Sequence, residues 1–350
     1  MTRSDWGSSG AAGRGRSMRP ERMAPFTATV LLLQLVSCVT PLPESSPGPS
    51  HMLSGAFIQL DAELALFTQE EWRTELQAMK DIAMDTVVVQ YAAYGESVYY
   101  PSGEGFGSEA RDTIGAILTA ADALSMRVYL GLSLDPAVRT GTLDPGREAE
   151  LNQGVLGALH RLYGARPSLA GWYLPEELDD RSFQSADATM AVKTYLSRMS
   201  GFAHDTMGLP VMVSPYFGMK PNPAAYARWW DDVLAGAKID IVALQDGVGT
   251  HRTTVAESAG VFAALAPVFS RHGVSFWANI EVFDQTHGWP VDNGSWSADT
   301  ASMERVRAQI QRETPWVEKS IIFDFPHYMS PRLQRSLYQK YKQLLTGDSR

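Results

Sequence analysis

Eight apolar, β-rich runs recur along the chain from about residue 53, and segments with helical periodicity alternate with them. The runs span residues 55–60, 86–92, 127–133, 169–175, 210–217, 239–245, 275–283 and 320–326. Nearly unbroken apolar strands that alternate with helices form a parallel sheet covered on both faces. Eight such units match one (β/α)₈ barrel, and no glycine-rich phosphate loop follows the first run, which disfavours an open doubly wound sheet. We therefore predict an α/β protein with a single TIM barrel over residues 53–346.

The distribution of charge separates the first residues from the rest of the chain. The net charge of the 350 residues is -9, and residues 1–37 hold five arginines and two acids, so their +3 leaves about -12 for the remainder. An acidic body is a poor partner for nucleic acid or anionic lipid, because both are negatively charged. The charge therefore favours a neutral or cationic partner and excludes nucleic-acid binding.

The single cysteine, Cys38, ends an apolar stretch near the N-terminus. The segment "MRPERM" is basic, and "APFTATVLLLQLVSC" after it has the length of a signal peptide and is too short to span a bilayer comfortably. Its ending resembles a bacterial lipobox; a plain secretory signal is the alternative. We predict that residues 1–37 are an N-terminal extension and signal peptide, that Cys38 carries a lipid, and that residues 38–52 form a Pro/Ser-rich tether. The protein is then exported and held in the bacterial cell envelope, at the periplasmic or cell-surface side of the outer membrane, only by its lipid.

The carboxyl ends of the expected strands carry aromatic rings beside amides and acids. Active sites of TIM barrels lie at this end, where the loops converge. Flat rings can stack on the apolar faces of a sugar, and amides can fix its hydroxyl groups, so we predict a carbohydrate substrate. The candidate substrate-binding residues are Gln59, Gln90, Tyr91, Trp172, Tyr216, Gln245, Asp246, Trp277, Asn279 and His327.

Two of the expected strands end on glutamates. The fourth ends on "GWYLPEELDD", with Glu176 and Glu177, and the seventh carries Glu281. Two facing carboxylates are the minimum equipment for glycoside hydrolysis; a separation of about 5–5.5 Å gives retention and roughly 6.5–9.5 Å gives inversion. Each glutamate alone could equally be a helix-start residue or part of a structural ion pair. Their occurrence on strands at opposite sides of one mouth favours the catalytic interpretation.

No metal or cofactor site is predicted. The histidines at 251, 287 and 327 do not form a helical pair such as H-E-x-x-H, and the chain lacks the G-x-S-x-G nucleophile elbow.

Four motifs, "GWYLPEELDD", "VSPYF", "IDIVALQDGVG" and "FWANIEVF", resemble the bacterial DUF4434 family, over about residues 54–345. That family is related to TIM-barrel glycoside hydrolases, and the resemblance implies the same fold here. Its pattern puts the shared acid at Glu177. The similarity to the retaining clan of glycoside hydrolases implies Glu177 as acid/base and Glu281 as nucleophile. That clan usually has asparagine before the first glutamate, where this chain has Glu176, so Glu176 stays an alternative acid/base.

These observations predict an exported, lipid-anchored glycoside hydrolase that needs no cofactor and acts as a monomer on a polysaccharide or oligosaccharide. The alternative is a catalytically inactive carbohydrate-binding or exopolysaccharide-associated lipoprotein on the same barrel, because a fold alone does not determine activity.

Overall fold

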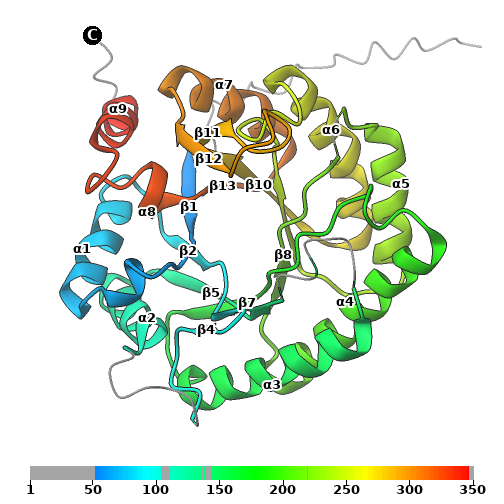
Figure 1. Cartoon of the computed structure of the whole chain (residues 1–350), viewed down its shortest axis with the longest axis horizontal. Coiled ribbons are helices and arrows are strands. Elements are labelled where there is room, and N and C mark those ends of the chain that lie inside the picture. The colour runs from blue at the N-terminus through cyan, green and yellow to red at the C-terminus, as the bar shows by residue number, and fades with distance from the viewer. Residues whose placement is uncertain (1–51, 104–110, 136–137, 139–142, 219, 347–350) are drawn as a thin grey trace, which may run out of the picture. The chain divides into compact units, whose positions relative to one another are not determined.

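The computed structural model describes residues 52–103, 111–135, 138, 143–218 and 220–346. The predicted signal peptide, Cys38 and residues 38–51 of the tether lie outside the described residues. Eight parallel strands close into a barrel, which confirms the predicted TIM fold (Figure 1). In chain order these strands are β1 (Leu53–Ile58), β2 (Thr86–Val89), β5 (Arg127–Gly131), β7 (Leu169–Leu174), β8 (Val211–Val213), β9 (Ile241–Gln245), β10 (Ser275–Glu281) and β13 (Lys319–Phe323).

Helices surround the barrel and cover the outward face of its strands (Figure 1). Thr68 before α1 and Thr254 before α6 each form a capping box with the glutamate three residues later, which satisfies free backbone donors at the start of the helix. The helices are α1 (Gln69–Lys80), α2 (Thr113–Leu124), α3 (Pro145–Tyr163), α4 (Ala186–Met207), α5 (Pro223–Leu234), α6 (Val255–His272), α7 (Met303–Glu313), α8 (Phe325–Tyr328) and α9 (Arg335–Thr346). Among the described helices, none is both long and apolar enough to cross a membrane.

The inside of the barrel is a packed core. Successive residues of a strand point to opposite faces, so alternate residues of each strand fill the interior. Gly171 makes one close contact possible, because a Cβ there would lie 2.6 Å from the ring of Tyr129. The interior cluster comprises Phe57, Val88, Tyr129, Tyr173, Met212, Ile241, Ala243, Trp277 and Ile321. A site on the axis of the barrel must therefore lie at one end of the barrel, beyond this packed interior.

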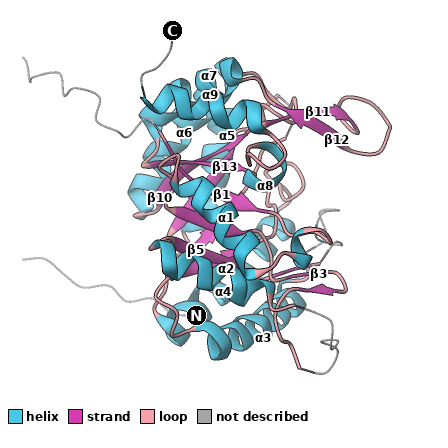
Figure 2. Cartoon of the chain, turned by 90° about the vertical axis from the view of Figure 1, so that its left-hand side faces the viewer, coloured by secondary structure: helices cyan, strands magenta, loops and turns pink. Residues whose placement is uncertain are grey.

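Short elements extend from the carboxyl end of the barrel. A hairpin of β11 (Phe283–His287) and β12 (Ser297–Thr300) follows β10, and it projects from the same end as β3 (Ala93–Tyr94) (Figure 2). β3 pairs with β4 (Ser97–Val98) and β6 (Ser133–Leu134) in a small separate sheet. Two 3₁₀ turns, Leu64–Leu66 and Thr314–Trp316, complete the described elements.

Candidate active site

A cavity of about 420 Å³ opens at the carboxyl ends of the barrel strands. Larger hollows lie outside helix α1 and at the amino-terminal end of the barrel. The smaller cavity is the candidate site, because TIM-barrel enzymes act at the carboxyl ends of their strands. It is lined by Gln59, Gln90, Glu177, Tyr216, Gln245, Thr250, Arg252, Glu281, Phe283, Gln285, Trp289, Trp296 and Phe323.

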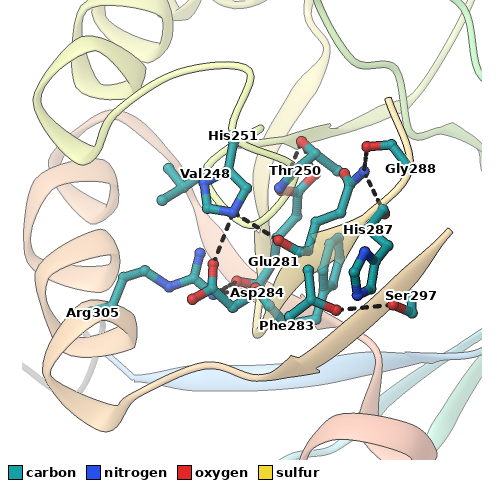
Figure 3. Close-up of polar contacts among 12 residues, drawn as sticks. Val248, Thr250, His251, Glu281, Phe283, Asp284, His287, Gly288, Ser297 and Arg305 are labelled. Atoms are coloured by element: carbon teal, nitrogen blue, oxygen red, sulfur yellow. Dashed lines mark hydrogen bonds and ion pairs between the residues drawn. The ribbon is translucent and has the colours of Figure 1, made fainter. Parts of the chain in front are cut away.

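Glu281 is the last residue of β10 and points into this cavity. Its side chain is held by Thr250, whose backbone N–H donates to Oε2 at 2.8 Å and whose hydroxyl donates to the same atom at 3.1 Å (Figure 3). The loop can approach this closely because residue 249 is glycine; a Cβ on Gly249 would lie 2.8 Å from the Cβ of Glu281. The carboxylate therefore has a fixed orientation at the wall of the cavity.

Two more buried carboxyl groups lie behind Glu281. Asp246 accepts the backbone N–H of Glu281 at 3.4 Å and the side-chain amide of Gln309 at 2.5 Å. Glu313, on α7, accepts the hydroxyl of Ser258 at 2.8 Å. Burial, followed by the charge of Asp246, raises the pKa of Glu281 to about 8, and burial raises the pKa of Asp246 to about 6. Burial also raises the pKa of Glu313 well above its usual range. This group of acids therefore resists full ionisation.

The two glutamates after β7 point in different directions. Glu177 is partly exposed and lines the cavity. Glu176 is 1% exposed, is not among the residues of the cavity wall, and accepts a hydrogen bond of 2.9 Å from the amide of Asn152 on α3. That amide also donates to Tyr195 on α4. Burial raises the pKa of Glu176 to about 8, so a neutral carboxyl group is favoured there. The structure therefore brings Glu177, and not Glu176, to the same cavity as Glu281.

The family model of a domain of unknown function, DUF4434, matches residues 53–335. The chain belongs to the DUF4434 family. An uncharacterized protein of Escherichia coli, YbcH, is 25% identical to this DUF4434 chain over 224 residues, which are 62% of this chain and 72% of YbcH. Among solved structures, a candidate α-L-fucosidase from Bacteroides thetaiotaomicron superposes with a TM-score of 0.70 at 22% identity, over 87% of this chain and 99% of that one. An endo-1,4-β-mannanase from Rhizomucor miehei gives a TM-score of 0.53 at 12% identity, over 78% and 86% of the two chains. These likenesses show a DUF4434 fold shared with glycoside hydrolases.

Four of the expected substrate-binding residues of the DUF4434 chain line the cavity: Gln59, Gln90, Tyr216 and Gln245. Gln245 donates from its amide to the carbonyl of Ser214 at 2.9 Å. Gln90 is 2% exposed, and within the described residues its Oε1 accepts no hydrogen bond. An unsatisfied buried acceptor is costly, so this amide oxygen is a ready partner for a hydroxyl group of a ligand.

Four other expected binding residues of the DUF4434 chain lie in packed surroundings instead of the cavity. Trp172 is fully buried on the outward face of β7, against the helices, because the alternation of the strand turns Gly171 and Tyr173 inward. Trp277 fills the barrel interior, and Asn279 above it donates to the hydroxyl of Ser214 at 3.0 Å. Tyr91 is 4% exposed and donates to the carbonyl of Leu60 at 3.0 Å. None of these four side chains lines the cavity.

The last two expected residues stand near the cavity without lining it. Asp246 lies beneath Glu281, as described above. His327 has one ring nitrogen 2.7 Å from Asp324 and the other 3.2 Å from Asp61. Burial alone would lower the pKa of His327, but hydrogen bonds and charges of the two aspartates outweigh it and raise the pKa to about 9. The imidazolium is thus paired with two carboxylates, and His327 does not line the cavity.

Sequence reasoning missed five wall residues of the DUF4434 chain that come from the β9–α6 loop and the β11–β12 hairpin. Thr250 and Arg252 belong to the loop between β9 and α6, and Gln285, Trp289 and Trp296 to the β11–β12 hairpin. A signal was present, because two tryptophans in the Gly/Pro/Asp-rich stretch "HGWPVDNGSW" are unusual for an ordinary connecting loop. Among the described residues, no group of histidine, cysteine, aspartate or glutamate side chains could hold a metal ion.

Proposed function

We propose that this protein is a glycoside hydrolase that cleaves a polysaccharide or oligosaccharide with Glu177 and Glu281. The observation that carries the proposal is that the glutamates after β7 and at the end of β10 line one cavity. Paired carboxyl groups supply both the proton and the nucleophile that glycoside hydrolysis requires. Amides such as Gln59 and Gln90 on the same wall add partners for sugar hydroxyls.

In the proposed retaining reaction, Glu177 gives its proton to the glycosidic oxygen while the bond from that oxygen to the anomeric carbon breaks. A carboxylate oxygen of Glu281 forms the new bond to the anomeric carbon. Water then attacks this carbon, its proton goes to Glu177, and Glu281 leaves as a carboxylate. Thr250 supports the role of Glu281 as nucleophile, since its two donors would hold the attacking carboxylate in one orientation.

The raised pKa of Glu281 gives a test of these roles. A nucleophile must be ionised, so with Glu281 in that role the rate rises with pH as this group loses its proton, toward about 8. If Glu281 instead donated the proton, the rate would fall over the same range. The pH dependence of kcat/KM shows which limb Glu281 sets, and a trapped covalent glycosyl–Glu281 adduct, detected by mass spectrometry, identifies the nucleophile.

The proposal is tested with the full-length protein and three matched variants: Glu177→Gln, Glu281→Gln and Glu176→Gln. Each is incubated with a panel of bacterial and plant polysaccharides and assayed for new reducing ends. We expect release by the parent and by Glu176→Gln, and a loss of at least about 100-fold in the other two. Saturable binding to a polysaccharide with no release from any would overturn hydrolysis and leave an inactive carbohydrate-binding protein.

We further propose that the protein is exported and lipid-anchored through Cys38, with the barrel on the periplasmic or cell-surface side of the envelope. The support is the basic and apolar segment that ends at this single cysteine. Metabolic labelling with palmitate should mark the parent and not Cys38→Ala. A labelled Cys38→Ala variant, or an unlabelled parent, would contradict the anchor.

A further inference from the structure

Arg252 lies at the rim of the cavity and stacks on aromatic rings. Its guanidinium carbon is 4.4 Å from the centre of the Tyr216 ring and 5.5 Å from that of Trp289. Its backbone is fixed as well, because the N–H of Arg252 donates to the carbonyl of Gly247 at 2.9 Å. Stacking on aromatic faces holds the flat group in place and leaves the N–H donors at its edge available.

No partner within the described part of the chain uses these donors. There the Arg252 guanidinium donates no hydrogen bond, and no carboxylate lies within 4.0 Å of it. Other arginines form ion pairs with acids: Arg147 with Asp135, Arg166 with Asp122, Arg271 with Asp231 and Arg332 with Glu63. A guanidinium offers five donors and no acceptor, so a fixed one in a cavity is prepared for a planar anion.

The hairpin beside Arg252 supplies an apolar surface. Trp289 is 57% exposed and Trp296 is 54% exposed, although both are large apolar side chains on the wall of the cavity. The hairpin is held in shape by Gln285, whose amide donates to three carbonyls, those of His287, Gly288 and Trp289, at 3.0–3.1 Å. A fixed, exposed pair of indoles at a cavity rim suits the apolar face of a sugar ring.

We propose that the substrate carries a hexuronate residue, whose carboxylate pairs with Arg252 and whose ring lies against Trp289 or Trp296. This rests on the proposed function only in that the cavity takes a carbohydrate. The guanidinium group of arginine matches a planar carboxylate and binds it through two parallel hydrogen bonds. A neutral sugar would leave the positive charge of Arg252 unpaired once water is displaced.

A uronate is an anion, whereas the net negative charge of the protein favoured a neutral or cationic partner. Charges farther away than about 8 Å are largely screened at physiological salt, so the groups beside a bound ligand decide its preference. Glu177 and Glu281 are acidic and also line the cavity, so the uronate must lie on the Arg252 side, away from the bond that is cleaved.

Arg252 could instead serve only to favour the ionised form of Glu281, whose pKa its charge lowers. Two variants of Arg252 distinguish the electrostatic role from binding of a carboxylate. Arg252→Lys keeps the positive charge and loses the flat bidentate edge, and Arg252→Gln loses both. A purely electrostatic role would leave Arg252→Lys close to the parent and would not distinguish acidic from neutral sugars.

The test measures binding by calorimetry to the full-length protein at low temperature. The acidic probes are hexasaccharides of galacturonate, mannuronate and hyaluronan; the neutral ones are cellohexaose and mannohexaose, and a carrageenan hexasaccharide presents sulfate instead. We expect at least one uronate probe to bind, and to bind at least 10-fold more weakly to Arg252→Gln, with Arg252→Lys in between. The control Arg271→Gln changes a surface arginine that pairs with Asp231 and should leave binding unchanged.

Several outcomes would overturn the uronate site: no uronate binding, equal binding by parent and Arg252→Gln, or binding confined to neutral or sulfated probes. Thermal unfolding of each variant shows whether a loss reflects misfolding, and binding of a neutral probe gives a second check on the fold. Uronate binding that depends on Arg252, with no hydrolysis of any probe, would support the uronate site and contradict the proposed hydrolase. Hydrolysis of neutral polysaccharides alone would support the proposed hydrolase and contradict the uronate site.

Discussion

The ends of β7 and β10 each bring a glutamate to the cavity, but the two are held in different ways. Glu281 is a strand residue, 2% exposed, with donors from Thr250 in front and the carboxyl group of Asp246 behind. Glu177 comes three residues after its strand has ended, is partly exposed, and follows a glutamate that points into the helix layer. The comparison teaches that a barrel strand fixes the direction of its own side chains, whereas residues just beyond it can diverge.

The largest expected effect concerns a residue inside β7. Trp172 is fully buried between the strand and the helices, so Trp172→Ala should cost about 3–5 kcal/mol of the free energy of unfolding. The rate per folded molecule should stay near that of the parent, because the side chain does not line the cavity. Urea unfolding, with activity measured on the folded fraction, checks both statements.

Trp296→Ala is the matched control, since this indole is 54% exposed. It should change the free energy of unfolding by less than about 0.5 kcal/mol. If instead Trp172→Ala unfolded at the urea concentration of the parent but lost carbohydrate binding, Trp172 would have to face the cavity.

The second effect concerns the acids behind β10. The negative charge of Asp246 raises the pKa of Glu281, so Asp246→Asn should lower that pKa, and the rising limb of kcat/KM should move to lower pH by about one unit or more. The measurement is the pH profile on whichever substrate the polysaccharide panel identifies. Asp231→Asn, a change at a partly exposed site on α5, should leave the profile in place.

Two other results of the Asp246→Asn experiment would be informative. A rising limb that stays where it is would mean that Glu281 does not set it. A falling limb that moves to lower pH would mean that Glu281 has the higher pKa of the two catalytic carboxyl groups, whichever of them donates the proton.

The fold could be predicted from sequence because strands buried on both faces form nearly unbroken apolar runs, and part of the site could be predicted because it lies at the carboxyl ends of those strands. Eight apolar runs identified the barrel, and the residues selected at their carboxyl ends include the wall residues Gln59, Gln90, Gln245 and Glu281. The alternation of inward and outward side chains along a strand, with its period of two, would have excluded Trp172 if it had been applied to β7. Loops have no such period, so Arg252 and the hairpin tryptophans could not be assigned, and neither could the divergence of the two glutamates after Pro175.

A third effect, the pH dependence of stability, should distinguish Glu176 from Glu177. The pKa of Glu176 is raised to about 8 in the folded protein, against about 4.3 in an unfolded chain, so the parent loses stability as pH rises from about 4 to about 8. Glu176→Gln mimics the neutral carboxyl group and should be more stable than the parent by about 1–3 kcal/mol at pH 8 and by little at pH 4. Thermal unfolding across this range measures the difference. Glu177→Gln, changed at a partly exposed site, should show a much smaller pH-dependent gain; an equal gain would contradict the burial assigned to Glu176.

The smallest effect comes from the donors in front of Glu281. The Thr250 hydroxyl favours the ionised carboxylate, so Thr250→Val should raise the pKa of Glu281, and the rising limb of kcat/KM should move to higher pH. The shift should stay below about one unit, because the backbone N–H of residue 250 keeps its 2.8 Å hydrogen bond to the same oxygen. Thr250→Ser retains the hydroxyl and should leave the limb in place. Thr250→Val should therefore raise the pKa of Glu281, and Asp246→Asn should lower it. Shifts of the same sign would mean that the limb belongs to another group, and Glu177 would be the first to examine.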